Sequence, residues 1–84
     1  MRQEVTLANG GRADCLSDTH AIEVEFSEKW AEGLGQALSY ASSTGLKPGI
    51  FLICRDKPQK CLGHHLRLEE AIADWKLPVD VWAR

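Results

Sequence analysis

The chain has 84 residues, of which 44% are hydrophobic and 26% are charged, a balance typical of one folded domain and not of a disordered or collagen-like chain. No run approaches the roughly 18 apolar residues that cross a bilayer, so we expect a single soluble, cytoplasmic domain over residues 1–84 with no membrane partner. The net charge of −2 argues against nucleic-acid binding through bulk positive charge, but it hides an asymmetry. Residues 1–42 carry three basic against seven acidic residues, whereas residues 43–84 carry seven against five.

The first third of the chain predicts a three-stranded meander. Short alternating segments at 4–7 and 12–16 are separated by Asn9-Gly10, which favours a tight hairpin because both residues tolerate a positive φ. A polar turn then leads to a third strand over residues 21–26.

A helix is expected next, from Ser27 as N-cap to a stop at Gly45. Its apolar positions recur at helical spacing and would pack on the sheet: Trp30, Leu34, Ala37, Leu38 and Ala41. Gly33 and Gly35 weaken this helix but would let it approach the sheet or a ligand closely.

The apolar run 50–54 predicts a strand that is covered on both faces. Since strand–helix–strand crossovers are right-handed, this strand should lie parallel to the strand over 21–26.

The C-terminal third predicts a second helix over 67–76, stopped by Pro78, and a short strand over 79–82. The apolar face of that helix would hold Leu68, Ala71, Ile72 and Trp75. The expected fold class is therefore α/β, with a three-stranded meander, a crossover helix, a parallel fourth strand, a second helix and a short C-terminal strand. Because no helix precedes the meander, one sheet face or edge lacks cover, and we expect a homodimer.

The cysteines are an odd set, Cys15, Cys54 and Cys61, and they contain no Cys-x-x-Cys pair. This pattern favours reduced thiols in a cytoplasm over a secreted disulfide framework. Zinc binding by Cys54, Cys61 and His64 is a second interpretation, although the spacing matches no standard zinc site and a packed thiol is the more common role.

Acidic residues gather on two predicted neighbouring strands. Strand periodicity turns Ile22, Val24 and Phe26 into the core and leaves Glu23 and Glu25 together on the opposite face. A short hairpin would bring Asp14 beside Glu23. Carboxylates that repel one another call for a cation, and oxygen ligands of this kind suit Mg²⁺ or Mn²⁺ with a phosphate substrate.

The predicted helix adds a polar line on one face, formed by Lys29, Gln36 and Tyr40. Such a line, running away from a carboxylate cluster, could follow a phosphodiester backbone. Each feature also has a structural interpretation, because alternating Glu on an exposed strand and Lys in a first helical turn are common solvated residues.

The order Gly11-Arg12-Ala13-Asp14, then Ala21-Ile22-Glu23-Val24-Glu25, then Gln36-Ala37-Leu38-Ser39-Tyr40 resembles the PD-(D/E)xK nuclease superfamily. The Gln-x-x-x-Tyr element is similar to that of RecB-type nucleases and Holliday-junction resolvases. The resemblance covers about residues 4–55 and implies a minimal restriction-endonuclease-like core.

The resemblance also implies a catalytic site for a divalent-metal-dependent endonuclease, a hydrolase acting on DNA. Asp14, Glu23 and the main-chain carbonyl of Val24 correspond to the metal ligands. Glu25 stands where the family has lysine, so Glu25 becomes an added ligand and Lys29 is expected to orient the attacking water from the helix. Gln36 and Tyr40 would steady the site or the DNA strand.

Two functions therefore follow from the sequence. The first is hydrolysis of DNA phosphodiester bonds with Mg²⁺ or Mn²⁺, with weak, metal-dependent DNA affinity because the chain is not basic. The second is a non-catalytic module on a nuclease-like scaffold that acts through a protein partner or its own dimer. The lysine missing at position 25 and the short chain favour this second interpretation.

Overall fold

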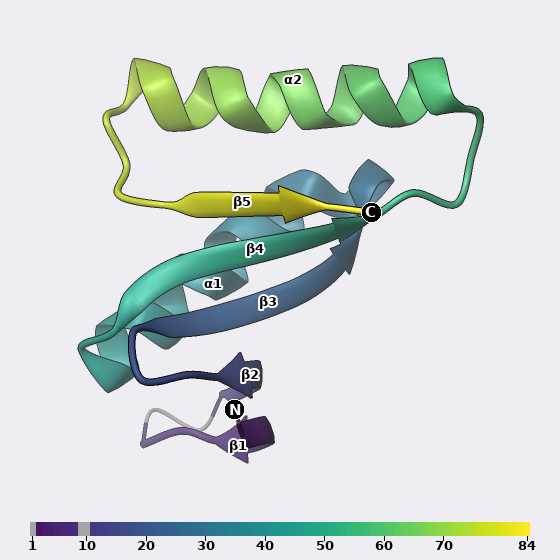
Figure 1. Cartoon of the computed structure of the whole chain (residues 1–84). Coiled ribbons are helices and arrows are strands. Elements are labelled where there is room, and N and C mark those ends of the chain that lie inside the picture. Colours follow the sequence, from purple (N-terminus) through teal and green to yellow (C-terminus); the bar gives the residue numbers. More distant parts are fainter. Residues whose placement is uncertain (1, 9–10) are drawn as a thin grey trace.

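The computed structural model describes residues 2–8 and 11–84, and in these the fold is α/β. Five strands form one mixed sheet in the order β1-β2-β3-β4-β5 (Figure 1). In chain order the elements are β1 (Arg2–Thr6), β2 (Arg12–Leu16), β3 (His20–Phe26), the short 3₁₀ helix η1 (Ser27–Lys29), α1 (Trp30–Thr44), β4 (Lys47–Ile53), α2 (Pro58–Asp74) and β5 (Asp80–Ala83). The predicted hairpin residues Asn9 and Gly10 lie outside the described residues.

Strand directions agree with the predicted topology. β1, β2 and β3 pair antiparallel as a meander, whereas β3–β4 and β4–β5 are parallel. Each parallel pair is joined through a helix, which supplies the crossover that parallel strands need. The three parallel strands therefore end at the same edge of the sheet.

The core lies between the sheet and both helices. Ile50 and Leu52 of β4 are almost fully buried and pack with Ala37 of α1 and Leu68 of α2. Phe51 and Ile53, which alternate with them, are half-buried. The prediction that this strand is covered on both faces is therefore wrong. Both helices pack on one face, because successive crossovers in the same direction put their helices on the same side.

The sequence predicted the C-terminal end of α1 correctly but not its N-terminal end. Gly45 ends the helix in the left-handed region at φ 71°, and its N–H donates to the Ala41 carbonyl, as predicted. At the other end Ser27 is not the N-cap, because it begins η1 and makes no capping bond. Its hydroxyl instead shares a 3.0 Å hydrogen bond with Nδ1 of His64 on α2.

The second helix begins nine residues earlier than predicted. Pro58 occupies its first turn, where a missing N–H costs nothing, and the polar segment that follows is helical. Leu68 and Ile72 reach the core as expected. Trp75 does not, since it lies just past the end of the helix and is 78% exposed.

The two faces of β3 are the reverse of those predicted. Glu23 is only 3% exposed, whereas Val24 and Phe26 are 36% and 37% exposed; Ile22, the third residue predicted for the core, is buried at 9%. The apolar pattern of this strand predicted the wrong face because the crossovers, and not the strand composition, decide where the helices pack. The sheet thus has a helix-covered face that carries buried acids and an open face that carries apolar side chains.

The cysteine prediction is wrong for two of the three residues. Cys54 and Cys61 form a disulfide with their Cα atoms 5.6 Å apart, and Cys15 is free. This bond also removes the thiols that the zinc interpretation needs. Within residues 2–8 and 11–84, no helix is long and apolar enough to span a membrane.

Candidate functional site

The acidic residues predicted to converge lie on adjacent strands. The antiparallel register pairs Cys15 with Ile22 and Leu16 with Ala21, so Asp14 falls opposite Glu23. The Oδ2 atom of Asp14 accepts the backbone N–H of Val24 at 2.9 Å. This bond fixes the Asp14 carboxylate against β3 where the sheet bonds between the two strands stop.

Glu23 is the buried member of this cluster. Burial, a hydrogen bond with the Asp14 side chain and the negative charges of Asp14 and Glu25 raise the pKa of Glu23 to about 9. At neutral pH the Glu23 carboxyl group is therefore protonated, and it is hydrogen-bonded to the Asp14 side chain. A buried, protonated carboxyl group beside a second carboxyl group is also suited to exchange its proton for a cation.

Gly33 of α1 allows the helix to lie directly over these acids. A Cβ atom at this position would come within 3.2 Å of the Glu25 side chain and 3.9 Å of Cγ of Glu23. The predicted close approach of helix and sheet is thus confirmed at Gly33, but not at exposed Gly35, where an added Cβ atom would meet nothing within 4 Å. The Oε1 atom of half-buried Glu25 accepts the N–H of Phe26 at 3.0 Å.

Tyr40 belongs to the same electrostatic environment. Burial raises the pKa of its hydroxyl, and the charges of Glu23, Asp14 and Glu25 raise it further. Arg12 opposes these effects, so a cation lies near Tyr40. No role was predicted for Arg12, although it lies two residues before Asp14 and therefore on the same strand face. Arg12 is exposed and forms a 2.9 Å ion pair with Glu4.

The other two predicted residues are not joined to the cluster by any contact. Lys29 ends η1 and Gln36 lies on α1, and both are exposed. Neither side chain has a hydrogen-bond or ion-pair partner among the described residues. The structure therefore brings together Asp14, Glu23, Glu25 and Tyr40, and leaves Lys29 and Gln36 at the surface.

The donor set limits which cation the cluster could hold. Among the described residues, no three His, Cys, Asp or Glu side chains are arranged as a ready metal site. Asp14 and Glu23 supply two adjacent carboxyl groups, and Gly33 lets α1 pack closely beside them without a side chain at this point of the helix. Two hard oxygen ligands fit Mg²⁺ or Mn²⁺ better than a softer ion.

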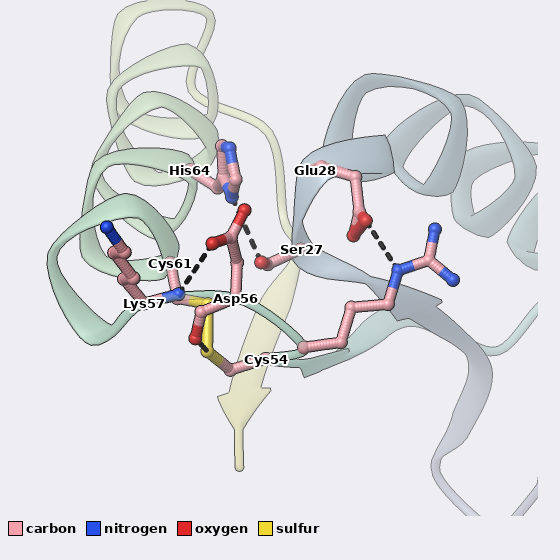
Figure 2. Close-up of a disulfide and its surroundings, with 8 residues drawn as sticks. Ser27, Glu28, Cys54, Asp56, Lys57, Cys61 and His64 are labelled. Carbon is pink, nitrogen blue, oxygen red and sulfur yellow. Dashed lines mark hydrogen bonds and ion pairs between the residues drawn. A yellow bond between two sulfur atoms is a disulfide. The ribbon is translucent and has the colours of Figure 1, made fainter.

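A second group of polar contacts lies at the sheet edge where β3, β4 and β5 end (Figure 2). The Ser27–His64 hydrogen bond joins η1 to α2, and Arg55 Nε donates to Glu28 at 2.6 Å. The Arg55 guanidinium also lies 3.7 Å from the centre of the Phe26 ring, a cation–π contact. These contacts hold η1, and with it Lys29, between the end of β3 and α2.

Comparison of the chain with protein-family models, with curated proteins and with solved structures found no match.

Proposed function

We propose that this protein is a divalent-metal-dependent nuclease that hydrolyses DNA phosphodiester bonds on a restriction-endonuclease-like core. The observation that supports it most strongly is the pair of Asp14 and Glu23, two hydrogen-bonded carboxyl groups on adjacent strands, of which Glu23 is buried. An uncompensated buried acid costs stability, and such costs are typical of functional sites.

In this proposal Asp14 and Glu23 bind the cation, with the Val24 carbonyl as a further ligand and Glu25 as an added acid. A divalent cation bound there would neutralise charge at phosphorus and lower the pKa of its water. Exposed Lys29 of η1 is assigned the orientation of the attacking water. Tyr40 steadies the acids, and exposed Gln36 contacts the DNA strand.

Nicking of supercoiled plasmid DNA tests this function. The purified protein with Mn²⁺ or Mg²⁺ should convert the plasmid to its relaxed form, and chelation of the metal should stop the reaction. Since the chain carries a net charge of −2, we expect weak DNA binding that depends on the metal and falls steeply with salt. A plasmid left intact across a range of Mn²⁺ and Mg²⁺ concentrations would exclude catalysis of this kind.

A non-catalytic module on the same scaffold is the second candidate, and the open face of the sheet favours it. Val24, Phe26 and Trp82 are 36–40% exposed, and apolar surface of this kind often marks a protein contact. A second copy of the chain, giving a homodimer, or a different protein would cover it. Calorimetry separates the two candidates, because a protein that fails to bind Mn²⁺ at millimolar concentration cannot be the proposed nuclease.

A further inference from the structure

The Cys54–Cys61 disulfide joins the edge where the parallel strands end to the start of α2 (Figure 2). Cys54 directly follows β4, and its N–H donates to the Arg84 carbonyl beyond β5 at 3.1 Å. Cys61 is the fourth residue of α2. The bond therefore spans a short loop and links two segments that other contacts already hold together.

The two sulfur-bearing residues differ in their access to solvent. Cys54 is exposed, whereas Cys61 is 9% exposed. Both line a cavity of about 280 Å³ whose other walls include Leu52, Pro58 and Leu62. A thiol compound entering from solvent thus meets Cys54 first, and the mainly apolar cavity beside the disulfide has room for part of it.

The residues around the disulfide would also stabilise the reduced form, in which Cys54 and Cys61 are free thiols. Cys61 lies near the N-terminal, positive end of a 17-residue helix, and the exposed Lys57 and Lys60 are close in sequence, so a thiolate released there is stabilised. The carbonyl oxygen of Asp56 lies 3.3 Å from Sγ of Cys54 and 3.8 Å from Sγ of Cys61, which gives either thiol an acceptor. The carboxylate of Asp56 is already occupied by the Lys57 N–H at 2.7 Å.

We propose that Cys54 and Cys61 form a redox-active pair that undergoes thiol–disulfide exchange with an external dithiol, and that Cys54 is the sulfur attacked. The first thiolate of the dithiol attacks Sγ of Cys54, the Cys54–Cys61 bond breaks, and its electron pair leaves on Cys61, which takes a proton from water. The second thiolate attacks the dithiol's own sulfur in the mixed disulfide and releases Cys54. The cysteine pair gains two electrons and the dithiol becomes a disulfide.

This proposal does not depend on the proposed nuclease, and a thiol assay tests it. The full chain carrying Cys15→Ser, which removes the free cysteine, is incubated in native buffer with dithiothreitol, acid-quenched, alkylated and weighed by mass spectrometry. We expect both thiols to be alkylated without denaturant while the circular dichroism spectrum persists, and glutathione disulfide to restore the bond. A disulfide that opens only in denaturant, or a pair that stays reduced in excess glutathione disulfide, would overturn the proposal.

The order of attack is tested with Cys61→Ser and Cys54→Ser, each in the Cys15→Ser background. Glutathione disulfide should modify Cys54 in the first variant at least about ten times faster than it modifies Cys61 in the second, because only Cys54 is exposed. Equal rates, or faster modification of Cys61, would contradict the assignment. If a variant fails to fold, peptide mapping of the chain with both cysteines after limiting reduced glutathione gives the same answer, since the adduct should lie on Cys54.

Discussion

Asp14→Asn should reduce metal-dependent nicking of plasmid DNA by at least about 100-fold. The asparagine side-chain oxygen can still accept the Val24 N–H that Asp14 now holds at 2.9 Å, so the strand geometry should survive. What the variant loses is the negative charge that would bind the cation beside Glu23. The measurement is the initial rate of plasmid relaxation in Mn²⁺, compared with the wild-type chain.

Asp18→Asn is the matched control, because Asp18 is an exposed acid on the turn between β2 and β3. It changes the net charge by the same amount and should leave nicking within about two-fold of wild type, as is usual for an isolated surface substitution. The more severe Asp14→Ala should abolish cleavage altogether. Unchanged activity in either Asp14 variant would refute the assignment of this residue to the site.

Glu23→Gln should stabilise the metal-free protein, and more so as the pH rises. The folded-state pKa of Glu23 is about 9, above the ordinary value of 4.5, so the folded state holds a proton that the unfolded state loses. The stability of the wild-type chain that depends on this proton is fully present below pH 4.5 and is lost as the pH rises toward 9. The loss is at most about 1.4 kcal/mol per pH unit, or up to about 4 kcal/mol between pH 5 and pH 8.

Urea unfolding with a chelator present, at several pH values, measures this difference. The gap in unfolding free energy between Glu23→Gln and wild type should widen from pH 5 to pH 8, because glutamine cannot ionise. Glu32→Gln, an exposed position in the first turn of α1, should show no such widening. A constant gap between Glu23→Gln and wild type over that range would mean that Glu23 is not held neutral by its surroundings.

The elements that the sequence predicted well have strong local signals. Gly45 ends α1 because it adopts a positive φ at low cost, and the apolar run around Ile50 and Leu52 forms β4, in which these two side chains are buried. The start of α2 was missed because its first turns are polar and only Cys61 and Leu68 of the helix are buried. Apolar periodicity, the signal used, is weak in such a segment.

Contacts between residues far apart in the sequence could not be predicted from the local sequence pattern. The convergence of Asp14 with Glu23 was predicted, since a short hairpin joins their strands, but the burial of Glu23 depends on which face both helices cover. The pairing of Cys54 with Cys61 depends on the end of β4 lying beside the start of α2. The nearness of Arg12 to Tyr40 likewise depends on how α1 lies across the meander.

The most direct test of the proposed nuclease is an anomalous diffraction map from a crystal soaked in Mn²⁺. The account predicts a peak between the carboxyl groups of Asp14 and Glu23, within coordination distance of both and absent from an Asp14→Asn crystal soaked in the same way. A fully soaked wild-type crystal with no peak there would contradict it. So would a peak that persists at this place in the variant.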